Sequence, residues 1–115
     1  MLYLYSVWFV AQNTLNKAKM IVKIHKNSNG QLVLAVCDKD LLGKKFEEGN
    51  KQLDLTSDFY KGQEKNEKEV ADLMRNAYMV NVVGEKSIKI VLKENLISRE
   101  NISLIAKIPY SNFVV

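Results

Sequence analysis

The chain shows its clearest pattern from residue 20 onward, where apolar and polar side chains begin to alternate. In the run MIVKIHK, residues 20–26, one face is apolar and the other carries Lys23 and His25, a period of two that is typical of a half-buried strand. The next four residues, NSNG, predict a turn because Asn and Gly adopt positive φ at low steric cost. The run QLVLAVC, residues 31–37, is apolar on both faces, which predicts an interior strand and completes an N-terminal hairpin.

A helix is predicted to begin after Asn66. Asn66 is followed three residues later by Glu69, the spacing of a capping box, in which the Asn side chain accepts hydrogen bonds from free backbone amides of the first turn. Apolar side chains then recur at i, i+3, i+4, i+7 and i+8 and form one stripe of an amphipathic helix: Val70, Leu73, Met74, Ala77 and Tyr78.

The remaining segments have weaker patterns. Three glycines divide residues 38–62, so we expect an ordered loop there with one strand, at residues 52–56. The apolar spacing of residues 85–95 fits a strand and a helix equally, and we choose a helix because Glu85 at its start and Lys93 near its end complement the helix dipole. The other expected elements are a strand at 78–83, a turn at 98–101, a strand at 102–108, a break at Pro109 and an edge strand at 112–115.

These elements predict the α+β class. We expect residues 20–115 to form a single small domain with a mostly antiparallel sheet, an N-terminal hairpin and two helices packed on it. A length of 115 residues is consistent with one domain.

Residues 1–19 are predicted to be a peripheral N-terminal extension. Their nine-residue apolar run, LYLYSVWFV, is less than half the length that a membrane-spanning helix needs. No basic stretch precedes this run, as a secretory signal would require, so we expect no membrane association and a cytoplasmic protein. Alternatively, Tyr3, Trp8 and Phe9 dock on a protein partner.

The composition restricts the available chemistry. Hydrophobic residues make up 47% of the chain and charged residues 26%, which is the range of ordinary globular proteins. A single His and a single Cys exclude a disulfide framework and a Cys/His zinc site. We therefore expect no metal and no cofactor.

The charge distribution favours an RNA partner. The formal net charge is +4, and lysines and aromatic residues are interleaved in residues 23–61. Ammonium groups neutralise phosphates, and exposed rings stack on unpaired bases. We therefore expect an accessory protein of translation that associates with RNA or the ribosome. Its predicted RNA-binding residues are Lys23, His25, Lys44, Lys45, Tyr60 and Lys61.

Two alternatives remain open on the sequence alone. The first is a protein-interaction or structural factor that has no contact with nucleic acid. The second is a small hydrolase or transferase, in which Asp38 would orient His25 as a general base or His25 would activate Cys37 as a nucleophile. Neither pairing has a catalytic motif, and the apolar run that contains Cys37 predicts a buried, slowly reacting thiol.

The runs AVCDKDLLGKKFEEG, LDL, DFYKG and NVVG, together with Pro109, resemble the small archaeal domain-of-unknown-function family 424 over residues 20–115. This resemblance implies an archaeal, cytoplasmic, single-domain α+β protein and no particular activity. The family pattern has His after Pro near its end, whereas this chain has Tyr110, which argues against a proton-transfer or metal role at that position. The residues that carry the resemblance are Asp38, Leu41, Leu42, Gly43, Lys44, Phe59, Tyr60, Gly62, Asn81 and Gly84.

Overall fold

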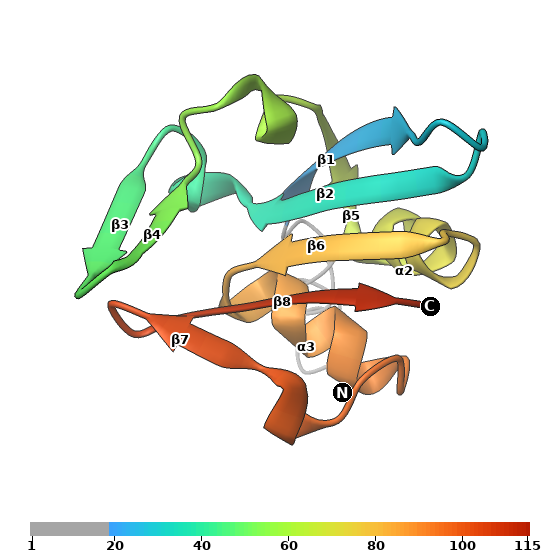
Figure 1. The fold of residues 1–115 in the computed structure, drawn as a ribbon. Coiled ribbons are helices and arrows are strands. Elements are labelled where there is room, and N and C mark those ends of the chain that lie inside the picture. The colour runs from blue at the N-terminus through green and yellow to red at the C-terminus, as the bar shows by residue number, and fades with distance from the viewer. Residues whose placement is uncertain (1–18) are drawn as a thin grey trace, which may run out of the picture.

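The structure, a computed structural model, describes residues 19–115 (Figure 1). The predicted role of the N-terminal extension therefore lies outside the described residues, except that Lys19 already belongs to the first strand. The elements in chain order are β1 (Lys19–Lys26), β2 (Leu32–Asp38), η1 (Lys39–Leu41), β3 (Lys45–Glu48), β4 (Lys51–Asp54), η2 (Asp58–Tyr60), β5 (Gln63–Asn66), α2 (Glu67–Arg75), β6 (Met79–Val83), α3 (Glu85–Lys93), η3 (Arg99–Asn101), β7 (Ser103–Ile105) and β8 (Ile108–Val114).

The main sheet has six strands in the order β5-β1-β2-β6-β8-β7, and β3 and β4 form a separate two-stranded sheet. Only the β2–β6 pair of the main sheet is parallel, and its other four pairs are antiparallel. The parallel pair follows from the connection, because the chain between β2 and β6 includes α2 and returns on the same side of the sheet. The predicted α+β class with a mostly antiparallel sheet is confirmed.

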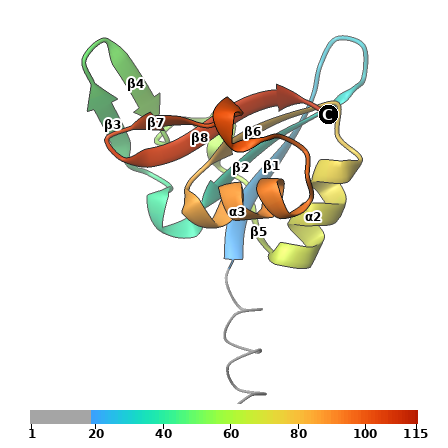
Figure 2. The ribbon, with the colours of Figure 1, turned by 90° about the horizontal axis from the view of Figure 1, so that it is seen from below.

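Both helices cover one face of this sheet (Figure 2). Alternate residues of β1, β2 and β6 point toward them, because side chains of a strand alternate between its two faces. The buried core on this side contains Met20, Val22, Leu34, Val36, Val70, Met74, Val80, Val82, Ile88 and Val91. Both the predicted hairpin and the two predicted helices are confirmed.

The start of α2 is fixed by its own sequence. The backbone amide of Glu69 donates to Asn66 Oδ1 at 2.9 Å, and the amide of Asn66 donates to Glu69 Oε1 at 3.3 Å, which completes the predicted capping box. The predicted stripe is wrong at its end. The helix ends at Arg75, and Tyr78 is 41% exposed because its amide donates to the Leu32 carbonyl and aligns the chain for β6.

Three predictions for the C-terminal third are also wrong. The strand expected at 102–108 is interrupted by a turn at Ala106 and Lys107, which separates β7 from β8. Pro109 does not break the chain but lies within β8, opposite Leu104 of β7. This is tolerated because the β6–β8 ladder ends at the Val83–Tyr110 pair, so that β6 needs no amide hydrogen from position 109. The segment predicted as an edge strand, residues 112–115, lies mostly in β8, which runs between β6 and β7.

Residues 38–62 contain more regular structure than predicted. The predicted strand is found as β4, but its partner β3 was expected to be loop, and the edge strand β5, which follows at Gln63–Asn66, was not predicted. The β3–β4 hairpin folds over the face of the main sheet that the helices leave free, and both of its strands contact β7. A second buried cluster forms beneath it from Ile21, Cys37, Leu41, Leu53, Leu55, Val83 and Ile105.

Cys37 is fully buried in this second cluster. Burial first, and then the nearby Asp38 and Asp40 carboxylates, raise the pKa of its thiol to about 12. At neutral pH the group is therefore almost entirely protonated, and the thiolate that would react is scarce. We expect an aromatic disulfide reagent to modify Cys37 at least about a hundredfold more slowly in the native protein than in denaturant. Equal rates in the two states would contradict the buried assignment.

Candidate nucleic-acid interface

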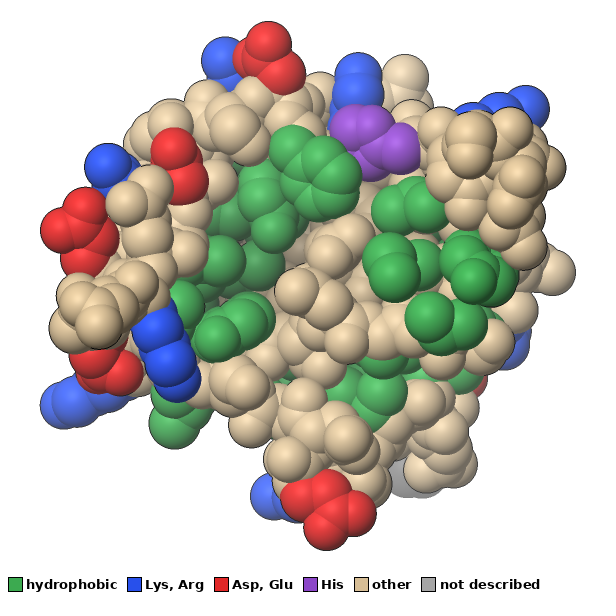
Figure 3. All heavy atoms as spheres, in the orientation of Figure 1, with side chains coloured by type: hydrophobic (Ala, Val, Ile, Leu, Met, Phe, Trp, Pro, Cys, Tyr) green, Lys and Arg blue, Asp and Glu red, His purple; other side chains and the backbone are tan. Residues whose placement is uncertain are grey.

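A cavity opens on the face of the sheet opposite the helices, where Figure 3 shows a hollow lined with apolar side chains. Its volume is about 300 Å³. The main sheet forms its floor, and η2 and the β3–β4 hairpin stand beside it. The lining residues are Lys51, Gln52, Leu53, Tyr60, Asn81, Val83, Ile105, Tyr110 and Asn112.

The floor of the cavity follows from the register of β6 and β8. Asn81 is paired with Asn112, and Val83 is paired with Tyr110. Directly opposed residues of an antiparallel pair project from the same face, with Cβ atoms roughly 5 Å apart. Two amides therefore lie next to each other on the floor. No other side chain or backbone group of residues 19–115 forms a hydrogen bond with either amide.

An aromatic cluster lies beside the cavity, and one of its members, Tyr60, lines the cavity. The His25 ring stacks on Phe59 with centroids 4.5 Å apart, and Phe59 meets Tyr60 edge to face at 5.1 Å. His25 Nε2 also lies 3.0 Å from the Phe59 carbonyl oxygen, so His25 fixes η2 to β1. Burial first, and then the nearby Cys37, raise the pKa of Tyr60, and its hydroxyl is a hydrogen-bond donor at neutral pH.

The predicted RNA-binding residues fall into two groups. Lys23, His25, Tyr60 and Lys61 come together where β1 meets η2, while Lys44 and Lys45 belong to the hairpin. Two of the lysines already have acidic partners. Lys61 Nζ lies 3.0 Å from Asp58, and Lys45 Nζ lies 3.5 Å from Glu47, with all four side chains well exposed to solvent. Such exposed pairs contribute little stability and can be exchanged for phosphate contacts.

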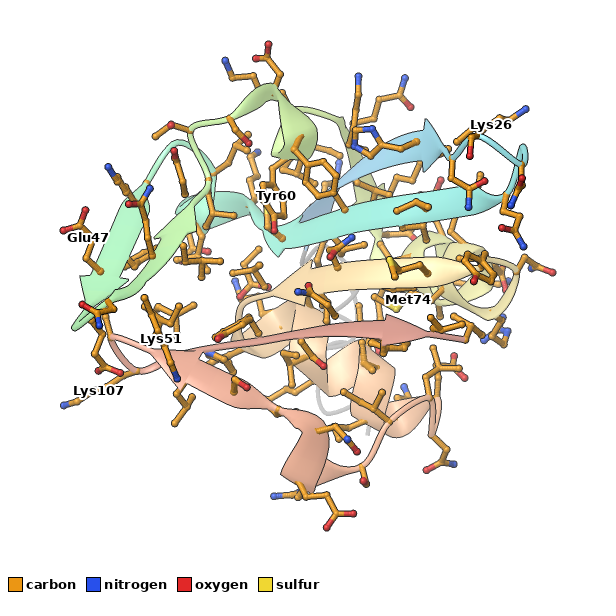
Figure 4. The ribbon with its side chains drawn as sticks, in the orientation of Figure 1. Lys26, Glu47, Lys51, Tyr60, Met74 and Lys107 are labelled. Carbon is orange, nitrogen blue, oxygen red and sulfur yellow. The ribbon has the colours of Figure 1, made fainter. Side chains whose placement is uncertain are left out.

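The site also includes residues that the sequence prediction omitted. Lys51 was part of the basic stretch but not of the predicted site, and Figure 4 shows its side chain extending from β4 toward β7. Asn112 and Tyr110 were assigned no binding role. The alternation of β8 could have indicated them, because Tyr110 and Asn112 lie two residues apart and so face the same side.

A second cavity of similar volume lies between α2 and α3. Most of the charged side chains that line it form ion pairs with one another. Arg75 pairs there with Asp72 and Glu94, and Lys93 Nζ lies 3.3 Å from Glu67. The basic and acidic groups neutralise each other across the helix pair. We therefore place the candidate site on the opposite face of the sheet.

The structure does not bring Asp38 and His25 together. Asp38 is paired with Met20, five positions along β1 from His25, which is roughly 17 Å at the usual rise per residue. Asp38 also turns to the helix side, where its carboxylate accepts hydrogen bonds from the amides of Lys86 and Ser87 and from the Ser87 hydroxyl. The expected pairing of Asp38 with His25 is therefore wrong, and Asp38 caps α3. Cys37 is paired with Ile21, four positions from His25, so the Cys37–His25 pairing does not form either.

The described part of the chain has neither a group of metal-binding side chains nor a helix that could span a membrane. Within residues 19–115, no three His, Cys, Asp or Glu side chains are grouped so that they could hold a metal ion. No helix in the same range is long and apolar enough to cross a membrane.

Comparisons with known proteins agree with the fold. The crystal structure of an uncharacterized conserved protein from Methanopyrus kandleri is similar, with a TM-score of 0.73 and 25% sequence identity. The match covers 84% of this chain and 90% of that chain. No curated protein matches the sequence. The family described as "Protein of unknown function (DUF424)" matches residues 25–115, five residues later than the start expected from the sequence motifs. The chain therefore belongs to the DUF424 family.

Proposed function

We propose that this protein is a cytoplasmic RNA-binding module, an accessory of translation associated with RNA or the ribosome. The observation that carries this proposal is the free face of the sheet, where an open cavity is lined by Tyr60, Tyr110 and Lys51. RNA would contact this face through unpaired nucleotides, because only unstacked bases expose their rings to aromatic side chains.

The arrangement separates two kinds of contact. Tyr60 and Tyr110 supply aromatic surface for bases, and stacking on such rings stabilises single-stranded complexes by about 1–3 kcal/mol per base. Lysines on three different elements supply phosphate contacts that depend little on sequence. These are Lys23 on β1, Lys61 after η2, and Lys44 and Lys45 at the start of the hairpin.

Reversal of charge at Lys44 and Lys45 tests the proposal. With both replaced by glutamate, we expect binding to structured RNA to weaken at least tenfold, about 1.4 kcal/mol, and the salt dependence of affinity to become shallower. Both side chains are exposed, so the fold should be retained. Titration of labelled RNA at several salt concentrations measures both quantities.

The matched control carries the same charge reversal on the helix side of the molecule. Lys86 and Lys89 are exposed residues of α3, and their replacement by glutamate should change RNA affinity less than the hairpin variant does. Equal affinity of the hairpin variant and the unmodified protein would remove Lys44 and Lys45 from the interface. If sedimentation of the unmodified protein in lysate is also insensitive to ribonuclease, a protein-binding role becomes the better proposal.

A further inference from the structure

We propose that the cavity on the free sheet face binds a single unpaired adenine base. If the base belongs to an RNA, this inference rests on the proposed function. It then gives the RNA interface a preference for adenine. The same chemistry would accept a free adenine nucleotide, so the experiment below distinguishes the two sources.

The size of the cavity favours one small planar ligand. Its volume of about 300 Å³ is at the lower end of the range found for small-molecule sites, roughly 300–1,000 Å³. That lower end suits one base or nucleoside better than a dinucleotide cofactor. Apolar side chains of β4, β6 and β7 form much of the wall, namely Leu53, Val83 and Ile105.

Aromatic side chains flank the floor on both sides. Tyr60 belongs to η2, which contacts β2, and Tyr110 belongs to β8. Because the sheet order is β2-β6-β8, these rings lie on either side of β6, which contributes Asn81 and Val83 to the floor. A base lying over β6 therefore meets an aromatic ring on each side, and its faces or edges can contact them.

The two floor amides select the base. Each Asn amide presents one acceptor oxygen and one donor nitrogen, and a bidentate amide contact suits adenine, whose N7 accepts while its N6 donates. Guanine presents two acceptors, N7 and O6, on the same edge, and the donor-and-acceptor pair of one amide does not match them. Asn81 and Asn112 face each other across the β6–β8 ladder and have no hydrogen-bond partner among the described side chains. Their hydrogen-bonding groups are therefore free for a ligand.

Lys51 places a positive charge at the rim of the same cavity. Its side chain is exposed, and no ion pair within residues 19–115 neutralises it. The phosphate attached to a bound adenosine would lie outside the apolar part of the cavity, where an ammonium group can reach it. The cavity thus combines the features that an adenine nucleotide requires: apolar and aromatic walls, two amides, and one cation at the mouth.

The experiment compares oligoadenylate, oligouridylate of equal length, and AMP as ligands of the full chain. We expect the unmodified protein to bind oligoadenylate about tenfold more tightly than oligouridylate, the discrimination that one bidentate amide contact supplies. The double variant Asn81→Ala/Asn112→Ala should reduce this preference to less than about twofold. The single variant Asn112→Ala, at an exposed position, provides a second test if the double variant unfolds.

Asn29→Ala is the matched control. Asn29 is exposed in the turn between β1 and β2, and its side chain is far along the hairpin from the cavity, so the preference for adenine should be unchanged. Thermal unfolding of each variant verifies that the fold is retained.

The outcomes separate this inference from the proposed function. Equal binding of the two oligonucleotides, or a preference that survives loss of the amides, overturns the adenine site and leaves RNA binding intact. If the protein binds AMP but neither oligonucleotide, and the amide variants lose AMP binding, the adenine site is supported and its use for RNA is contradicted. Failure of all three ligands overturns the adenine site, and RNA binding then depends on the structured-RNA titration alone.

Discussion

Replacement of Gly62 by alanine is expected to destabilise the protein by about 3 kcal/mol or more. The added Cβ would lie 1.9 Å from the Val22 carbonyl oxygen and 2.6 Å from the Lys23 amide nitrogen. Both atoms belong to the backbone of β1, which is held by β2 on one side and β5 on the other. Because both neighbouring strands hold this backbone in place, it cannot shift to make room for the Cβ. The segment between η2 and β5 would therefore have to move away from the sheet.

The displacement would also affect the proposed interface. Phe59 and Tyr60 lie three and two residues before Gly62, and the stacking of Phe59 on His25 depends on the close approach of this segment to β1. We therefore expect weaker RNA binding in addition to the lower free energy of unfolding. Denaturant unfolding followed by circular dichroism gives the stability change, and RNA titration gives the second readout.

Gly49→Ala is the control for this substitution. Gly49 has φ +60°, but nothing lies within 4 Å of the Cβ that alanine would add. Alanine in the left-handed region costs about 1–2 kcal/mol. Gly62 does not have a positive φ, so its larger expected effect is due to the steric clash alone. A smaller loss of stability for Gly62→Ala than for Gly49→Ala would show that the segment moves freely.

Replacement of Asp38 by alanine is expected to cost about 3 kcal/mol. The Asp38 side chain is only 5% exposed, and its two oxygens accept the amide of Lys86 at 3.1 Å and the amide and hydroxyl of Ser87 at 2.8 Å. Alanine would leave two amides at the start of α3 and a buried hydroxyl without partners. An unpaired buried donor costs about 1–3 kcal/mol, so this loss exceeds that of an ordinary exposed helix cap.

Two comparisons make the Asp38 prediction specific. Asp38→Asn keeps the shape and one acceptor oxygen, so we expect it to lose less stability than Asp38→Ala. Asp40→Ala removes an exposed carboxylate two residues away and should change the free energy of unfolding by less than about 0.5 kcal/mol. Equal stability of the Asp38 and Asp40 variants would contradict the capping role.

The contact of Asp38 with α3 also explains why residue 84 is a glycine. Gly84 has φ +109°, and a Cβ there would lie 2.3 Å from the carboxyl carbon of Asp38. The absence of a side chain at Gly84 thus lets the carboxylate reach the first turn of α3. Asp38 and Gly84 both carry the family resemblance, and in this chain they serve one contact between β2 and α3.

The sequence by itself determined the elements whose signals are local. The capping box joins Asn66 to Glu69 three residues away, and the β1–β2 hairpin needs only the turn between two adjacent strands. Such contacts involve few residues, so the residue types at fixed spacing are sufficient to predict them. The same holds for the burial of Cys37, which follows from an apolar run of neighbours.

The tertiary structure alone decided the elements and sites that depend on distant pairing. β5 is a short polar strand, and it forms because β1 offers a free edge to Gln63–Asn66. The cavity joins Asn81 to Asn112 across a ladder that no local pattern specifies. Register over such separations is set by how the whole sheet packs on its helices. For that reason the sequence identified basic and aromatic residue types, while only the fold placed Tyr60, Asn81 and Tyr110 around one cavity.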